Sequence, residues 1–244
     1  MNYQTNPSII VDPDNPPSQG AFPVWSKVFT RPTEQTFVQI TEHPEARART
    51  AYIWVFLAGT LSGLINSLTR FLIALAGLRQ IAPEFGQLPG SPALFGIGGL
   101  LGALCGAPIA GVFSLIGFAI GVSIVQATAK FFGGEGSFDR LAYAFGAIAV
   151  PFSVISALMV PLNLLPYVAF CTIPALIVLS LYVLFLEVTA VKAVHRFGWG
   201  EAAAALFLPT ILLVMLCALL FFVAMRIAGP SINEIFQQLQ GLQP

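Results

Sequence analysis

The sequence predicts an all-α protein: a polytopic membrane helix bundle with five transmembrane spans and additional interfacial amphipathic helices. Two compositional observations support this class, since 57% of the residues are hydrophobic and only 9% are charged, against about 25% charged in ordinary soluble domains. The third observation is that long apolar runs, each sufficient to cross a hydrocarbon core of about 30 Å, follow one another along the chain. Basic and acidic residues number eleven each, so no net charge favours nucleic acid binding.

The first fifty residues divide into two parts. Residues 1–20 are rich in proline and polar residues, which predicts a disordered cytoplasmic tail. Residues 21–50 carry apolar side chains at helical spacing and are predicted to form an interfacial amphipathic segment of two short helices. A loosely ordered linker with scattered apolar residues is the alternative. The apolar residues concerned are Trp25, Val28, Phe29, Phe37 and Ile40.

Residues 51–228 are predicted to form the membrane domain. Residues 94–106 are expected as a half-length helix before the second span, because Pro108 offers a break. Without that break, a single straight helix reaching residue 132 would be about 58 Å long. The five predicted spans cover residues 51–78, 107–132, 141–160, 167–191 and 202–225.

The C-terminal segment is predicted to be separate from the fifth span. Gly229 and Pro230 are expected to end the helix. Ser231 and Glu234 form a capping-box pattern that precedes an apolar stripe. Residues 229–244 are therefore predicted to form an amphipathic helix on the far surface of the membrane.

Glycines spaced by four residues predict close helix contacts. Gly59 and Gly63 form one such face in the first span. Gly98, Gly102 and Gly106 form a GxxxGxxxG ladder in the half-length helix. For the ladder, general close packing is favoured over a dedicated dimer interface.

The polar segment between the second and third spans is interpreted as a cytoplasmic hinge. Gly133 and Gly134, followed by Gly136, can end the incoming helix through a residue with positive φ. Ser137 is predicted to cap the start of the third span. The alternative is an anion-binding nest of backbone N–H groups, against which two nearby carboxylates argue.

Two charged residues lie near the membrane edges. Arg70, near the far end of the first span, is interpreted as a structural anchor that snorkels to the interface, with an ion or substrate contact as the alternative. Glu187, near the cytoplasmic end of the fourth span, is expected to be paired, with a proton or cation site as the alternative. Its expected partners are Lys192, Arg196, Arg140 and Lys130.

The distribution of basic residues predicts the orientation of the chain. The N-terminus is expected to be cytoplasmic and the C-terminus outside, which places eight basic residues inside and three outside. The eight are Lys27, Arg31, Arg47, Arg49, Lys130, Arg140, Lys192 and Arg196, and the three are Arg70, Arg79 and Arg226.

The sequence lacks the short patterns that are typical of enzymes. It contains no His-Glu-x-x-His, no Gly-x-Ser-x-Gly and no nucleotide-binding loop, and its two histidines, His43 and His195, lie on separate segments. We therefore expect no catalytic activity, no metal and no cofactor. Cys105, Cys171 and Cys217 lie in apolar runs and are interpreted as small buried hydrophobic residues.

Several segments resemble one known family by their order and spacing. They are Trp25-Ser-Lys-Val-Phe-Thr-Arg-Pro32, Phe132-Gly-Gly-Glu-Gly-Ser-Phe138, Ala142-Tyr143 with Pro151, and His195-Arg-Phe-Gly-Trp-Gly-Glu-Ala202. From Trp25 to Ala228 the chain resembles the prokaryotic branch of the Yip domain family, which are five-span membrane proteins named after the Ypt/Rab-interacting proteins. For eukaryotic members the resemblance implies Rab GTPase association and a role in vesicle formation or membrane shaping. The Asp-Leu-Tyr-Gly-Pro type motif of those members is absent here, which argues against Rab binding.

The expected function is that of an integral membrane scaffold or accessory subunit, acting through helix packing and cytoplasmic loops, with membrane organisation as one role. The alternative is a small-molecule or ion transporter or permease component, whose polar candidates within the membrane are Asn66, Arg70 and Glu187. The expected partners are the lipid bilayer and other membrane subunits or a second copy. The expected location is the cytoplasmic membrane of a prokaryote, because no targeting segment is recognised and the resemblance is to the prokaryotic branch.

Overall fold

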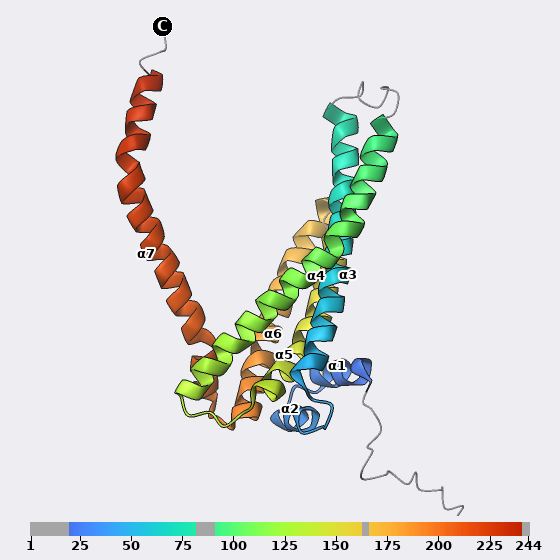
Figure 1. Ribbon diagram of the computed structural model, residues 1–244, viewed down its shortest axis with the longest axis vertical. Coiled ribbons are helices and arrows are strands. Elements are labelled where there is room, and N and C mark those ends of the chain that lie inside the picture. Colours follow the sequence, from blue (N-terminus) through green and yellow to red (C-terminus); the bar gives the residue numbers. More distant parts are fainter. Residues whose placement is uncertain (1–19, 82–90, 163–165, 241–244) are drawn as a thin grey trace, which may run out of the picture.

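The computed structural model describes residues 20–81, 91–162 and 166–240, and all regular secondary structure in these ranges is helical (Figure 1). Five of the helices are long and apolar enough to cross a membrane, so the prediction of an all-α, five-span protein is confirmed. Apart from Gly20, the predicted tail lies outside the described residues. The helices are α1 (Ala21–Thr30), α2 (Glu34–Thr41), α3 (Ala48–Ile81), α4 (Ser91–Phe131), α5 (Phe138–Leu162), α6 (Pro166–His195) and α7 (Trp199–Gln240).

The two short helices α1 and α2 lie across one end of the long helices (Figure 1). Helix α2 begins where the hydroxyl of Thr33 accepts a hydrogen bond from the backbone N–H of Thr36, at 3.2 Å, which is the usual N-cap arrangement. Its apolar stripe then buries Phe37 and Ile40 completely within the protein core. The amphipathic pattern of residues 21–50 is therefore used for packing against the long helices.

Helix α3 packs along α4 through Gly59 and Gly63. A Cβ atom placed on Gly59 would lie 2.6 Å from the Cβ of Ser114, and one on Gly63 would lie 2.5 Å from the Cβ of Ala110. Both distances are far below van der Waals contact, so only glycine permits this approach of the two helices. Gly102 and Gly106 of the ladder have no neighbouring atom in such positions, and the surroundings of Gly98 lie outside the described residues.

Helix α4 is continuous through Pro108, so the expected break into a half-length helix and a separate span is wrong. A proline removes a single backbone hydrogen bond, whereas an interrupted helix in lipid would leave several polar groups unpaired. In addition, Ala103 and Ala107 on either side of the break point are buried. Packing therefore holds this segment in the helical state.

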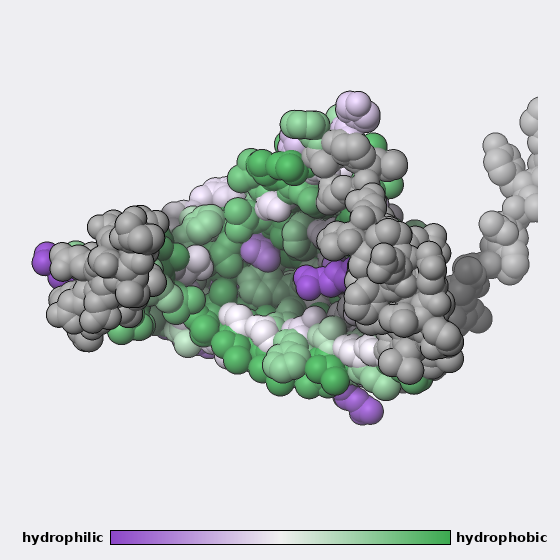
Figure 2. Space-filling view, turned by 90° about the horizontal axis from the view of Figure 1, so that it is seen from above, coloured by the Kyte–Doolittle hydropathy of each residue, from purple (hydrophilic) through white to green (hydrophobic). Residues whose placement is uncertain are grey.

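Helix α7 also continues through Gly229 and Pro230 and ends at Gln240, so the expected separation of a C-terminal helix is not observed. Its path diverges from the other helices (Figure 1), and every side chain from Ile211 to Val223 is exposed. Viewed along the long axis, the space between α7 and the other helices is a hollow with largely hydrophobic walls (Figure 2).

The three cysteines are free and exposed on the helix surfaces, so their interpretation as residues buried in the protein is wrong. In a membrane protein an apolar run does not imply burial against protein, because lipid tails are as apolar as a leucine side chain. The position of a residue within an apolar run therefore does not show whether its side chain faces protein or lipid. The residues are Cys105 on α4, Cys171 on α6 and Cys217 on α7.

Candidate functional site

The loop that follows α4 ends that helix with a double hydrogen bond. Gly133 has a φ of +85°, and its N–H donates to the carbonyl oxygen of Lys130 at 3.0 Å. The N–H of Gly134 donates to the carbonyl oxygen of Ala129 at 2.9 Å. This pair of bonds is the Schellman arrangement, in which glycine occupies the left-handed position. Of the two candidate glycines, Gly133 is therefore the one that reverses the chain.

The start of α5 is tied to the start of α3. The Ser137 hydroxyl accepts a long hydrogen bond, 3.4 Å, from the N–H of Arg140, and caps α5. The Asp139 carboxylate accepts a bond of 3.0 Å from the N–H of Ala48, the first residue of α3. A carboxylate at this place also complements the positive end of the α3 dipole. Ser137 and Asp139 at the start of α5 thus cap two helices, α5 and α3.

Two of the hinge glycines, Gly134 and Gly136, lie directly against the end of α6. The Gly136 N–H donates to Nδ1 of His195 at 3.2 Å, and Gln126 Nε2 donates to the Gly136 carbonyl oxygen at 3.0 Å. A Cβ atom on Gly134 would lie 2.4 Å from Nδ1 of His195. His195 itself is only 2% exposed, so the loop and the histidine form one buried contact.

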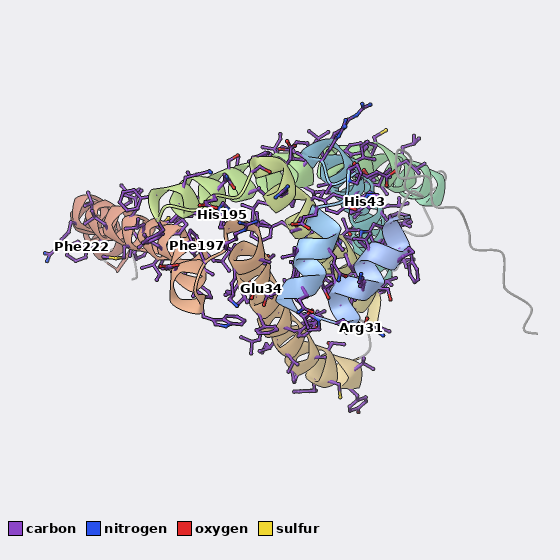
Figure 3. The ribbon with its side chains drawn as sticks, turned by 90° about the horizontal axis from the view of Figure 1, so that it is seen from below. Arg31, Glu34, His43, His195, Phe197 and Phe222 are labelled. Carbon is purple, nitrogen blue, oxygen red and sulfur yellow. The ribbon has the colours of Figure 1, made fainter. Side chains whose placement is uncertain are left out.

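Beyond His195 the chain turns through a second left-handed residue. Arg196 has a φ of 58°, and the N–H of Phe197 donates to the carbonyl oxygen of Lys192 at 3.1 Å. The Phe197 ring then stacks on the His195 ring, with 5.5 Å between centroids (Figure 3). Since left-handed backbone costs a non-glycine residue about 1–2 kcal/mol, this turn is held by its surroundings.

Lys192 connects three helices at this end of the molecule. Its ammonium group forms an ion pair with Glu34 of α2 and lies 4.9 Å from the centre of the Trp199 ring at the start of α7. The expected pairing of Lys192 with Glu187 is therefore wrong, because α2 folds over the end of α6 and presents its own carboxylate. Within the described residues Glu187 forms no ion pair. Arg70 is exposed on α3, far along the chain from this cluster.

We call this assembly the polar-end cluster. It comprises α1, α2, the loop of residues 132–137, the first turns of α5 and α7, and the last turns of α6. Sequence reasoning missed the central role of His195, because its partner is 59 residues away in the chain. The available signal was that the segments 132–138 and 195–202 both contribute to the family resemblance.

Comparison with models of known protein families gives a match over most of the chain. A family model described as the Yip1 domain matches residues 26–225, a range that includes the whole polar-end cluster except the first residues of α1. No curated protein and no solved structure was found to match. Because the matched range covers most of the 244 residues, the chain belongs to the Yip1 domain family.

Proposed function

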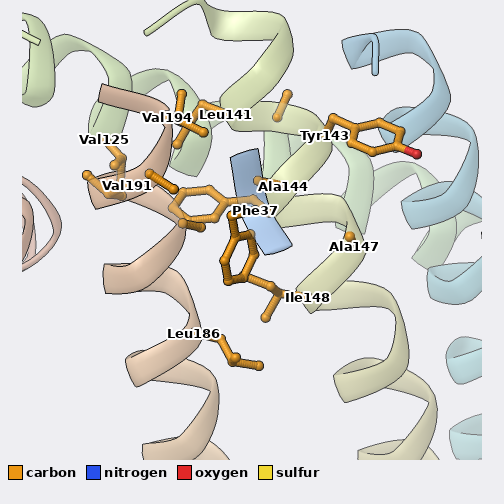
Figure 4. Close-up of a cluster of buried hydrophobic side chains, with 14 of the residues drawn as sticks. Phe37, Val125, Leu141, Tyr143, Ala144, Ala147, Ile148, Leu186, Val191 and Val194 are labelled. Carbon is orange, nitrogen blue, oxygen red and sulfur yellow. The ribbon is translucent and has the colours of Figure 1, made fainter. Parts of the chain in front are cut away.

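We propose that this membrane protein acts as a scaffold or accessory subunit, without catalysis, and that it engages its partners through the polar-end cluster. The observation that carries the proposal is the way in which this cluster is built. Segments from α2, α5 and α6, far apart in the sequence, converge on one buried core around Phe37 (Figure 4). A surface held so firmly can present a fixed arrangement of side chains to a partner.

The contacts between α1 and α6 support a rigid surface. The hydroxyl of Tyr182 donates to the carbonyl oxygen of Phe29 at 2.6 Å, and the two rings are 6.0 Å apart. Trp25 of α1 meets Trp54 of α3 edge to face, at 5.5 Å between centroids. Helix α1 is thus fixed to two spans by polar and aromatic contacts, which together stabilise its position.

The exposed side of α2 is the proposed contact surface for a protein partner. A broad, open cavity of about 740 Å³ is lined there by side chains of a single helix and its cap. Four of its five lining residues are polar and one, Val38, is apolar, and non-obligate interfaces commonly combine polar and apolar groups. Its lining residues are Thr33, Glu34, Gln35, Val38 and Gln39.

The test is purification of the tagged full-length protein from its native membrane at native expression level, with quantification of copurifying proteins. We expect a partner in fixed stoichiometry, and we expect Gln35→Arg to remove it, because the substitution places a long charged side chain on the exposed face of α2. Arg70→Gln, on the exposed surface of α3, is the matched control and should retain the partner. Substrate-dependent flux in proteoliposomes of the isolated protein would instead support the transporter alternative.

A further inference from the structure

We propose that a second cavity at the polar end binds the headgroup of a phospholipid that carries both a phosphate and a primary ammonium group. This headgroup pocket has a volume of about 280 Å³, close to the lower end of the usual range for small-ligand sites, roughly 300–1,000 Å³. It lies between α2, the first turn of α5 and the end of α6. Its lining residues are Glu34, Val38, Thr41, Glu42, Arg140, Ala193, Val194 and Arg196.

The headgroup pocket is lined by charges of both signs, and three of its four charged residues form no ion pair among the described residues. Glu34 is already bound to Lys192. In the part of the chain that the structure describes, Glu42, Arg140 and Arg196 form no ion pair, although all three line the same cavity. Charges that share a cavity but lie beyond ion-pair distance can be bridged by one ligand that carries a charge of each sign.

The two arginines suit the phosphate of such a ligand. A guanidinium group presents several N–H donors in a planar fork that matches phosphate oxygens. Arg140 also lies in the first turn of α5, where the helix dipole favours a negative charge. The phosphate is therefore expected between Arg140 and Arg196.

Glu42 suits the other end of the ligand. A primary ammonium group carries three N–H donors and can bond directly to this carboxylate. A trimethylated ammonium group has no N–H to donate, and a glycerol headgroup has no positive charge. The pocket should thus prefer phosphatidylethanolamine over phosphatidylcholine and phosphatidylglycerol.

The position of the headgroup pocket favours a lipid as the source of this chemistry. It lies where one apolar span begins and another ends, which is the level of lipid headgroups in a membrane. Val38, Ala193 and Val194 contribute apolar lining beside the charged residues. A lipid can place its headgroup among the charges while its acyl chains remain in the bilayer.

The test measures lipid binding to the purified full-length protein by native mass spectrometry, with the three phospholipids named above at equal concentration. Lipid binding is measured on the isolated protein and does not depend on the copurification of protein partners, so this inference can fail while the scaffold proposal stands. We expect phosphatidylethanolamine to bind about tenfold more tightly than the other two, the equivalent of one hydrogen bond to a charged group. Equal binding of all three lipids would overturn the proposal.

Two variants assign the ends of the ligand. Glu42→Gln, which is nearly isosteric, should remove the preference for phosphatidylethanolamine while phosphatidylglycerol binding is retained or rises. Arg140→Gln combined with Arg196→Gln should weaken all three lipids. Arg31→Gln, an exposed arginine outside the pocket, is the control and should change nothing.

The source of the ligand is tested by competition. Soluble phosphoethanolamine carries the same charges without acyl chains, so it should compete only weakly with the lipid. Protection of the protein against thermal unfolding by phosphoethanolamine equal to that by the lipid would show that the ligand is a free metabolite, and would contradict the lipid assignment. An unchanged lipid preference in Glu42→Gln would contradict the pocket itself.

Discussion

The backbone N–H of Gly136 and Nδ1 of His195 are joined by a buried hydrogen bond of 3.2 Å. Because Nδ1 accepts this bond, the neutral imidazole carries its proton on Nε2. Nε2 is buried and makes no hydrogen bond among the described residues. The His195 side chain therefore makes a single hydrogen bond among the described residues, as an acceptor, and this bond joins the loop after α4 to the end of α6.

His195→Ala is expected to destabilise the protein by about 1–3 kcal/mol, because the buried N–H of Gly136 loses its acceptor. His195→Asn can keep an acceptor oxygen near the position of Nδ1, so it should recover part of that loss. Thermal unfolding of the purified variants in one detergent measures both. His43→Ala, at a half-buried position outside the core, is the control, and equal stability of His195→Ala and the wild type would contradict the role of the bond.

The two glycines at the end of α4 should respond differently to substitution, since they are required for different reasons. Gly133 has positive φ but open space around it, whereas Gly134 has ordinary φ but lies against His195 and Phe197. Gly133→Ala should thus cost about 1–2 kcal/mol from backbone strain alone, and Gly133→Asn less, because asparagine tolerates this region better.

Gly134→Ala should cost more, because its new Cβ would lie 2.4 Å from His195 Nδ1 and 2.8 Å from the Phe197 ring. Combining Gly134→Ala with Phe197→Ala removes one of the atoms in conflict, so the two losses should be less than additive in a double-mutant cycle. Strict additivity of the unfolding free energies would show that the loop does not rest on Phe197.

The number of spans was predictable because it depends on the length of the apolar runs, a local property of the sequence. Whether a proline interrupts a membrane helix depends instead on its neighbours, and the packing of α4 on α3 around Ala107 could not be inferred locally. Whether regularly spaced glycines make close helix contacts likewise depends on the neighbouring helix and not on their spacing alone. Gly59 and Gly63 pack closely while Gly102 and Gly106 face open space, although both sets share one spacing.

The polar-end cluster was predictable only in part. The glycine turn and the Ser137 cap use interactions between residues a few positions apart, which leave a recognisable pattern. The contacts of His195 with Gly136 and of Asp139 with Ala48 join residues 59 and 91 positions apart. Such pairs depend on how whole helices are placed, and a single sequence carries no local record of them.

Arg196 offers a test of backbone strain at the end of α6. Its φ of 58° is disfavoured for a residue with a Cβ atom, so Arg196→Gly should be neutral or stabilising, by up to about 1 kcal/mol. Arg196→Gln removes the same charge without relieving the strain and is therefore the matched control. Thermal unfolding should place the glycine variant above the glutamine variant, and the reverse order would show that Arg196 contributes contacts that outweigh its strain.

The orientation of the chain remains a prediction that the fold makes testable. Helix α1 and the end of α7 lie at opposite ends of the long axis (Figure 1), as five spans require. Most of the basic residues near span ends gather with α1 and α2, so this end should face the cytoplasm.

A topology reporter fused before Met1 should thus be active inside, and one fused after Pro244 outside. Substitution of Arg47 and Arg49 by Gln should weaken this bias, whereas substitution of Arg70 and Arg226 should not. Reporters found on the same side of the membrane would rule out five spans, and an inverted pair would place the polar-end cluster, with its proposed lipid and protein contacts, outside.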